Sequence, residues 1–258
     1  MILTHENYFS KEADLEYMSV SQYKNFKQCE AKALNDLQQE SQDTKQAFIE
    51  GHFFEELVAG DAKLYIAQHP EMISSRGSTA GQLKAEYKTA VEAAEKFKEQ
   101  ELFRNIIAES AKQVIMTGEI EGVPVKCCHD LLCKEKKGIY DIKYMKDFTD
   151  QWSKEDKRYI PWYYAWGYVL QLAVYQEIAR QNLGEIYNTH LMAATKEKTP
   201  DIAGLKLDNT LLELELEDFK KNIKHYDNIK KGIEKPVACG CCDYCKRIKK
   251  IIQWEEIK

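Results

Sequence analysis

The chain changes from helical to strand-like spacing near Gln113, and the segment that follows restricts the fold more than any other. Apolar and polar residues then alternate in three short runs, residues 113–120, 123–133 and 139–145. A Glu-Gly pair separates the first two runs, and a Lys-Lys-Gly sequence separates the last two, as in hairpins. The pattern predicts an antiparallel meander in which 123–133 and 139–145 pair across their turn.

Three charged residues lie within this predicted meander. Asp130 is near the end of one run, and Asp141 and Lys143 lie two residues apart in the next, on one face of the strand. Pairing of the runs brings the two carboxylates together, where they repel each other unless a cation lies between them. Mg²⁺ prefers such sparse carboxylate sites. Two carboxylates and a lysine that hold magnesium and position a water have the chemistry of phosphodiester cleavage.

A simpler interpretation of Asp141 and Lys143 is a structural ion pair, because unpaired charge in an apolar strand is costly to bury. The acid-x-lysine spacing alone has little weight, since Glu30 and Lys32 also match it in a chain with 42 acidic and 37 basic residues. The second acid, Asp130, favours the metal site over the ion pair.

A third acid lies on a helix predicted over residues 47–58. Gly51 and Glu55 are four residues apart and therefore share one face of this helix. The glycine would allow the helix to approach the sheet, and Glu55 would then complete the metal site. An ordinary surface acid is an equal alternative. Glu56 points roughly 100° away from Glu55 and is predicted to face solvent.

The remaining hydrophobic spacing predicts helices on both sides of the meander, the first of them capped by Ser19 or Ser21. Helical spacing covers residues 19–37, 82–115, 161–180 and 209–231, and further strands are predicted over 185–195 and 202–207. With 258 residues and 44% hydrophobic content, this order of elements predicts one α/β domain with helical additions.

The cysteines gather at the C-terminal end of the sequence. Cys239, Cys242 and Cys245 have the two-residue spacing that metal sites favour, and Cys241 lies between them. Three ligands need a fourth, which Cys241 offers for a zinc site. A cluster of reduced surface thiols is the alternative. Three further cysteines, Cys127, Cys128 and Cys133, are predicted to pack as small hydrophobic residues.

Net charge and hydropathy restrict the class of protein. The chain carries a net charge of −5, which does not indicate a polyanion partner, although lysines gather at 134–137 and 246–250. It has no apolar run long enough to cross a membrane and no secretory signal at its start, so we expect a cytoplasmic protein without membrane association. In the cytoplasm the cysteines are not expected to form disulfides.

Four segments, in order along most of the chain, resemble the PD-(D/E)XK nucleases. They are Met-Ser-Val-Ser-Gln-Tyr-Lys-Asn-Phe-Lys-Gln-Cys-Glu over 18–30, Gly-His-Phe-Phe-Glu over 51–55, Asp130 with Asp141-Ile142-Lys143, and Gln171-Leu-Ala-Val-Tyr175. The last is typical of the RecB-type branch, which includes phage exonucleases such as lambda exonuclease and exodeoxyribonuclease VIII. The tail Cys-Gly-Cys-Cys-Asp-Tyr-Cys over 239–245 is similar to that of prophage-encoded members.

The resemblance implies a restriction-endonuclease-like α/β fold, with a central mixed sheet flanked by helices in a single domain over 1–258. The helix at about 19–37 and the cysteines of 239–245 would form a metal-bound appendage. Cys29, Cys239, Cys242 and Cys245 would then hold a [4Fe–4S] cluster, with Zn²⁺ as the alternative.

The resemblance also implies the role of each site residue. Asp130 and Asp141 would bind Mg²⁺ or Mn²⁺, aided by Glu55 and the backbone carbonyl of Ile142, and Lys143 would orient or help deprotonate the attacking water. Gln171 and Tyr175, one helical turn apart, would order the site and contact DNA. The chain departs from the family pattern in having Glu55 in place of histidine, Tyr144 in place of threonine and His129 in place of proline.

The function that these residues predict is a magnesium-dependent DNA exonuclease that degrades duplex DNA from its ends in phage-type recombination. The resemblance implies a single-strand annealing recombinase as partner, and ring-shaped homo-oligomers. An endonuclease or a CRISPR-adaptation-type nuclease with the same site is the alternative among enzymes. A catalytically silent, metal-stabilised DNA-binding module is the alternative of another class.

Overall fold

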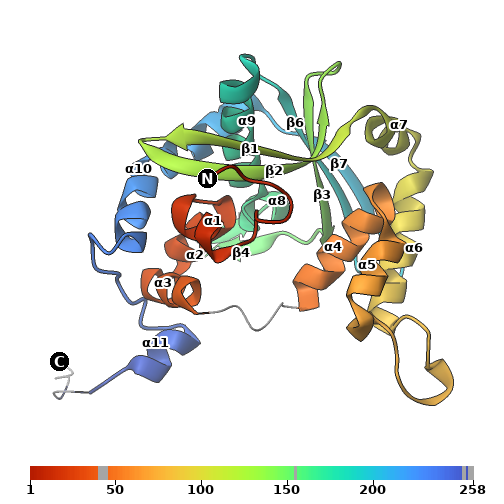
Figure 1. Ribbon diagram of the computed structural model, residues 1–258, viewed down its shortest axis with the longest axis horizontal. Helices are drawn as coiled ribbons and strands as arrows, with labels where there is room; N and C mark the ends of the chain where they lie inside the picture. Colours follow the sequence, from red (N-terminus) through yellow and green to blue (C-terminus); the bar gives the residue numbers. More distant parts are fainter. Residues whose placement is uncertain (40–45, 154–155, 252–253, 255–258) are drawn as a thin grey trace. The chain divides into compact units, whose positions relative to one another are not determined.

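A five-stranded mixed sheet organises the computed structural model, which describes residues 1–39, 46–153, 156–251 and 254 (Figure 1). The sheet has the order β1-β2-β3-β6-β7, with β1 Ala111–Ile120, β2 Val123–Cys133, β3 Gly138–Met145, β6 Asn188–Thr195 and β7 Ile202–Lys206. β2 and β3 are antiparallel, as predicted, β3 and β6 are parallel, and β6 and β7 are antiparallel. The predicted α/β class with a central mixed sheet flanked by helices is confirmed.

Helices precede, interrupt and follow the sheet. They are α1 Lys11–Glu16, α2 Val20–Gln28, α3 Glu30–Gln38, α4 Gln46–Ala59, α5 Ala62–Gln68, η1 Pro70–Met72, η2 Gly77–Thr79, α6 Ala85–Glu99, α7 Glu101–Glu109, α8 Trp162–Ala165, α9 Tyr168–Leu183, α10 Asn209–Lys230 and α11 Asp243–Ile248. A short hairpin of β4 Gln151–Ser153 and β5 Arg158–Ile160 forms a second sheet. Because β3 and β6 are parallel, the chain between them makes a crossover, which contains α8 and α9.

The chain forms two compact units. One consists of Met1–Gln42, Thr117–Lys126 and Glu217–Lys258, and is called the terminal unit below. The other consists of Asp43–Met116 and Cys127–Leu216, and is called the sheet unit. The acidic residues predicted for the metal site all belong to the sheet unit, and the four cysteines of the predicted cluster all belong to the terminal unit.

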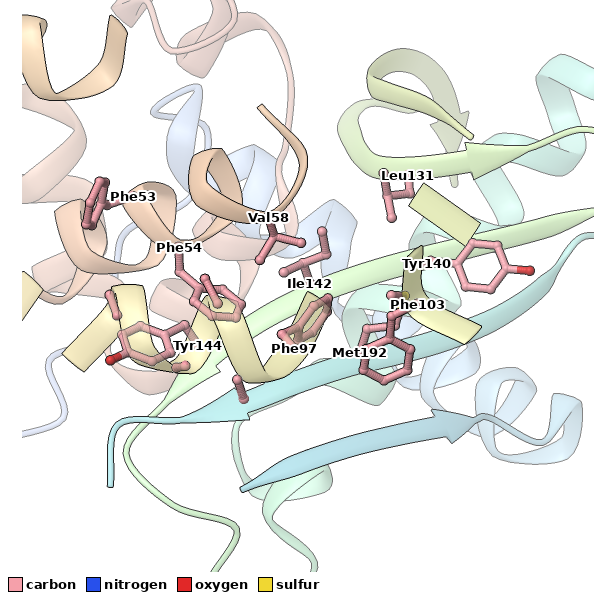
Figure 2. Close-up of a cluster of buried hydrophobic side chains, with 14 of the residues drawn as sticks. Phe53, Phe54, Val58, Phe97, Phe103, Leu131, Tyr140, Ile142, Tyr144 and Met192 are labelled. Carbon is pink, nitrogen blue, oxygen red and sulfur yellow. The ribbon is translucent and has the colours of Figure 1, made fainter. Parts of the chain in front are cut away.

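Aromatic side chains fix α4 and α6 against the sheet within the sheet unit (Figure 2). Phe54 of α4 stacks on Tyr144 of β3 with ring centroids 4.7 Å apart, and it also lies edge-on to Phe97 of α6 at 5.5 Å. Phe54 and Phe97 are fully buried, and each contributes roughly 1.5–3 kcal/mol through burial. This packing places Glu55, the next residue of α4, at a fixed position along β3.

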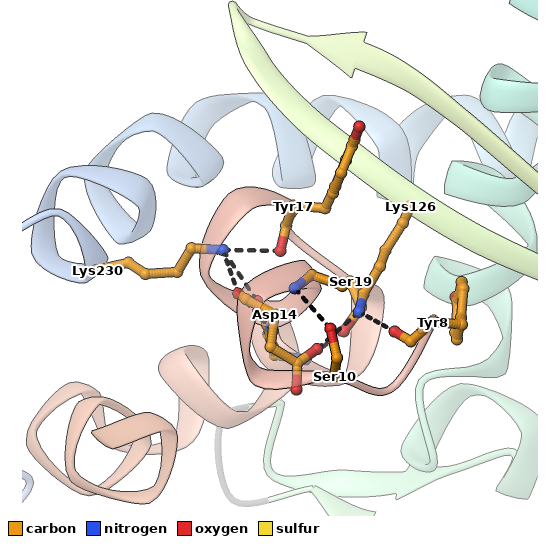
Figure 3. Close-up of polar contacts among 9 residues, drawn as sticks. Tyr8, Ser10, Asp14, Tyr17, Ser19, Lys126 and Lys230 are labelled. Atoms are coloured by element: carbon orange, nitrogen blue, oxygen red, sulfur yellow. Dashed lines mark hydrogen bonds and ion pairs between the residues drawn. The ribbon is translucent and has the colours of Figure 1, made fainter. Parts of the chain in front are cut away.

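Two buried lysines hold the N-terminal segment in the terminal unit (Figure 3). Lys126 donates from Nζ to the Tyr8 carbonyl at 2.5 Å and to Oδ1 of Asp14 at 2.7 Å. Lys230 donates to the carbonyls of Asp14 and Tyr17 at 2.8 and 2.7 Å. Buried ammonium groups need such partners, because an unpaired buried charge is strongly destabilising. The sequence pattern did not predict this arrangement or α1.

Three predicted helices are each divided in the structure. The helix expected over 82–115 is interrupted at Gln100 between α6 and α7, and its last residues belong to β1. The other two are broken at Cys29 and at Gly167. The helix expected over 19–37 is broken at Cys29, whose extended backbone (φ −166°, ψ 105°) separates α2 from α3. Ser19, rather than Ser21, caps α2 by accepting from the Gln22 amide. The helix expected over 161–180 is broken at Gly167, which has a left-handed backbone (φ 67°). In both places the hydrophobic spacing continues through the break, so periodicity alone did not reveal it.

Candidate active site and cysteine cluster

Asp130 and Asp141 meet across the β2–β3 pairing, as the hairpin pattern predicted. Asp130 is on β2, and its Oδ2 accepts a hydrogen bond from the backbone amide of Ile142 on β3 at 2.8 Å. Ile142 and Tyr144 belong to the hydrophobic core under α4. Because side chains alternate along a strand, Asp141 and Lys143 point to the other face of β3.

The Asp141 carboxylate is buried and held from two elements. Lys143 Nζ lies 2.6 Å from its Oδ2, and Gln171 of α9 donates from Nε2 to its Oδ1 at 2.8 Å. The ion pair of Asp141 and Lys143 therefore exists, but it is one part of a larger cluster. The crossover helix α9 supplies the amide, which adds a hydrogen bond without adding charge.

Repulsion between carboxylates is the main electrostatic feature of this cluster. The pKa of Asp130 lies well above its usual value because the group is buried and because the charges of Glu55 and Asp141 oppose its ionisation. Lys143 and the Ile142 amide act in the opposite direction but do not outweigh these effects. Asp130, together with the two carboxylates that oppose its ionisation, forms a set of hard oxygen donors suited to Mg²⁺ or Mn²⁺.

The surrounding acids favour the protonated form of Lys143. Burial lowers its pKa, but the charges of Asp141, Asp130 and Glu55 outweigh burial, and the net pKa is above the usual value. Its Nζ also lies 5.4 Å from the centre of the Tyr168 ring, a cation–π contact. A protonated ammonium can orient water and stabilise negative charge, whereas it cannot remove a proton.

Glu55 lies partly buried on α4 and acts electrostatically on the other site residues. Its charge raises the pKa of Asp130 and of Cys128, and its Oε2 lies 3.4 Å from Nδ1 of His52. The expectation that Gly51 brings the helix close to the sheet is wrong, because a Cβ at this position would meet no atom within 4 Å. Glu56 does not simply face solvent, since its Oε2 accepts from the Asp61 amide at 2.7 Å.

Tyr175, the second predicted residue of α9, packs against the strand that carries Asp130. Its ring lies edge-on to His129 with centroids 5.0 Å apart. Burial lowers the pKa of His129 to about 4, so this histidine is neutral at physiological pH. The sequence pattern assigned no role to His129, and its position next to Asp130 in the chain was the available signal.

The four cysteines predicted from the family resemblance come together in the terminal unit. The sulfur atoms of Cys29, Cys239, Cys242 and Cys245 all lie within 4.8 Å of one another, and all are free thiols. Cys29 reaches the group because the chain is extended between α2 and α3, and Cys242 caps α11. Cys241 lies 3.6 Å from the Cys239 sulfur but is not one of these four.

The local backbone prepares one of these thiols for metal binding. The amides of Cys241 and Cys242 point at the Cys239 sulfur and lower its pKa to about 6, which favours the thiolate that metals require. The four sulfurs, as they are placed, suit one tetrahedral ion, since Zn–S bonds of about 2.3 Å separate the sulfurs by about 3.8 Å. A [4Fe–4S] cluster would require the same cysteines to lie farther apart.

A histidine fixes the segment that leads to the cluster. His225 of α10 lies 3.0 Å from Glu30 and 2.6 Å from Glu234, and both carboxylates raise its pKa. Glu30, next to Cys29, also accepts from the Val237 amide at 2.7 Å. These contacts hold residues 234–237 against the start of α3, so the C-terminal cysteines are placed near Cys29. No sequence pattern indicated this role for His225.

The family model described as "PDDEXK-like domain of unknown function (DUF3799)" matches residues 19–248. The chain belongs to this family. The predicted membership of the PD-(D/E)XK superfamily is therefore confirmed. Membership in a PDDEXK-like family supports a nuclease, and the meeting of Asp130, Asp141 and Lys143 supplies the residues that such an activity needs.

One solved structure is similar over almost the whole length of this PDDEXK-like chain. It is a protein from Eubacterium rectale described as a "putative exonuclease", with 33% identity, a TM-score of 0.89, and coverage of 99% of this chain and 97% of that chain. A second structure, described as that of SSO0001, has 14% identity over 85% of this chain and 93% of that chain. Its TM-score of 0.31 is too low to support an argument. No curated protein matches the chain.

Among residues 1–39, 46–153, 156–251 and 254, no helix combines the length and the apolar character that crossing a membrane requires.

Proposed function

We propose that this PDDEXK-like protein is a magnesium-dependent exonuclease that hydrolyses DNA from duplex ends. The observation that carries the proposal is the cluster in which Asp130, Asp141 and Lys143 meet beside Glu55. The similarity to a protein described as a "putative exonuclease", at 33% identity over 99% of the chain, supports cleavage from ends.

Asp130, Asp141 and Glu55 would hold the metal, with the Ile142 carbonyl as a further ligand. Bound Mg²⁺ or Mn²⁺ would supply positive charge that lowers the pKa of a bound water and stabilises the phosphate oxygens. Lys143 would orient or help deprotonate the attacking water and would stabilise charge on the phosphate. Hydrolysis leaves a 5′-phosphate.

Gln171 positions Asp141, and Tyr175 supports β2 through its contact with His129. Through these contacts both residues position the acids, and neither acts directly on the reacting bond. We further propose, from the family resemblance, that Tyr175 contacts the DNA strand.

We propose that Cys29, Cys239, Cys242 and Cys245 bind a structural metal centre. The sulfur separations favour a single ion such as Zn²⁺, and the resemblance favours a [4Fe–4S] cluster. Purification without oxygen, followed by a visible spectrum and elemental analysis, distinguishes them. Visible absorption together with iron identifies the cluster, and zinc without colour identifies the single ion.

The decisive experiment compares digestion of end-labelled linear duplex with that of closed circular DNA in Mg²⁺. We expect loss of linear DNA alone, and we expect Lys143→Ala to reduce the rate by about 10³-fold or more. Glu55→Gln should also lower the rate, whereas Glu56→Gln, on the next residue of the same helix, should not.

Other outcomes would change the conclusion. Nicking of the circular DNA would identify an endonuclease with the same site, including the CRISPR-adaptation type. Binding of DNA without cleavage of either form would identify a silent binding module. A recombinase partner, a homo-oligomer and a cytoplasmic location are parts of the proposal that rest on the family resemblance and on the sequence.

A further inference from the structure

An open pocket of about 300 Å³ lies between the β4–β5 hairpin and the turn from α8 to α9. It belongs to the sheet unit, and none of the residues assigned above to the metal site lines it. We call it the tryptophan pocket. Its lining residues are Gln151, Trp152, Ser153, Ile160, Ala165 and Trp166.

The two tryptophans of this pocket expose large apolar surfaces. Trp152 is 55% exposed and Trp166 is 51% exposed. By contrast, Trp162, four residues before Trp166, is buried and stacks on Phe148 with centroids 4.6 Å apart. Trp152 also packs edge-on against Tyr159, its partner in the β4–β5 pairing, at 5.4 Å. Two half-exposed indoles that line the same pocket are unfavourable in water and indicate a binding surface rather than a core.

Both segments that form the pocket continue directly into the active site. The chain that leaves β3, just after Lys143, enters β4 six residues after Met145. Trp166 is followed by Gly167, whose left-handed backbone begins α9, and then by Tyr168. The Tyr168 ring contacts Lys143, and Gln171, one turn later, donates to Asp141. The pocket is therefore joined to the catalytic cluster by short, structured connections on both sides.

We propose that the tryptophan pocket binds an unpaired base of the DNA strand that occupies the active site. This inference rests on the proposed function, because it assumes a DNA substrate. Indole faces stack on any base, so such a pocket accepts a single strand without requiring a particular sequence. The neighbouring charges are balanced, with Asp150 and Asp156 against Lys157 and Arg158, so the indole faces rather than a positive patch would supply the binding. An enzyme that works from an end requires a place for a frayed or protruding nucleotide, and this pocket supplies it.

The test measures binding of a fluorescent 12-nucleotide single strand, in protein that also carries Lys143→Ala to prevent hydrolysis. Trp152→Ala and Trp166→Ala should each weaken binding by roughly 5- to 100-fold, the range for loss of one base stack. Trp152→Phe and Trp166→Phe should retain most of the affinity. Trp254→Ala is the matched control, because Trp254 is 97% exposed and does not line the pocket.

A second arm uses the probe instead of the protein. A series of strands, each with one base replaced by an abasic residue, should show a loss of affinity at one or two positions. At those positions Trp166→Ala should cause no further loss. Equal affinity for all strands, or equal affinity of the tryptophan variants and Trp254→Ala, overturns the proposal. The abasic series can be measured on protein that retains both tryptophans, so it tests the proposal even if an alanine variant does not fold.

These outcomes separate the pocket from the proposed function. If linear DNA is cleaved, but neither the tryptophan substitutions nor the abasic residues change binding, the proposed nuclease function stands and the proposed base-binding role of the pocket is wrong. If the protein cleaves no DNA but binds bases through the two tryptophans, the base-binding role of the pocket stands and the proposed nuclease function is wrong.

Discussion

Gln171 donates a hydrogen bond to the Asp141 carboxylate over 2.8 Å, although 30 residues separate them in the chain. The contact joins the crossover helix α9 to β3. It uses Oδ1 of Asp141, whereas the ion pair with Lys143 uses Oδ2. A neutral amide at this place fixes the carboxylate without changing the charge of the metal site. The preceding turn of α9 carries Tyr168, so one helix positions both charged residues of β3.

Gln171→Glu should lower DNA cleavage at neutral pH by about 10²-fold or more, since it places a fourth carboxylate next to Asp141. Activity should recover partly as the pH falls toward 5, where the new carboxyl group becomes protonated. Cleavage rates measured between pH 5 and 8 test this. Gln181→Glu, the same change at an exposed position of α9, should have the wild-type profile. A pH profile of Gln171→Glu parallel to that of the wild type would contradict the positioning role.

Asp130→Asn should abolish cleavage and yet stabilise the metal-free protein by about 0.5–2 kcal/mol, because it removes one of the buried, mutually repelling charges. The asparagine oxygen can still accept from the Ile142 amide. Chemical denaturation in EDTA measures the change. Added Mg²⁺ should stabilise the wild type and have little effect on the variant.

The same substitution should alter the pH dependence of stability. Asp130 has a pKa raised above its ordinary 3.8, so between these values the native state binds more protons than the unfolded chain. Its contribution to stability therefore falls as the pH rises through that range. Asp130→Asn should remove this fall, and identical slopes for the two proteins would contradict the assignment.

Cys29→Ser should remove the metal from the terminal unit and lower its stability, because Cys29 is the ligand that links α2 and α3 to the C-terminal cysteines. Loss of one ligand is expected to reduce metal content well below that of the wild type. Cys241→Ser serves as control and should retain the metal, since Cys241 is not one of the four converging thiols. Metal analysis of both proteins after identical anaerobic purification measures the difference.

Lys230 should make stability rise with pH above neutrality. Burial lowers its pKa to about 8, below the ordinary 10.5, although Asp227 and Asp14 oppose the shift. Between these two pH values the unfolded chain binds more protons than the native state, so stability increases with pH, by at most about 3 kcal/mol. Lys230→Met should lack this increase relative to the wild type when denaturation is compared at pH 7.5, 8.5 and 9.5. Parallel curves would contradict a lowered pKa.

Local sequence patterns were sufficient to predict the two strands that carry Asp130 and Asp141. The alternating runs placed β2 and β3 within one or two residues of their observed limits, and the turn between them dictated that Asp130 and Asp141 approach each other. This worked because hairpin pairing depends on residues close in sequence. The breaks at Cys29 and Gly167 were missed, since both helices keep their apolar spacing across the break.

The sequence by itself determined the α/β class, the meander with its acids and lysine, and the spacing of the C-terminal cysteines, because each depends on neighbouring residues. Only the tertiary structure decided that Gln171 holds Asp141, that Cys29 joins the other three thiols, and that Gly51 faces open space. It also decided that three carboxylates raise the pKa of Lys143 and that Trp152 and Trp166 line one pocket. These features depend on burial and on contacts between distant segments, which no local pattern encodes.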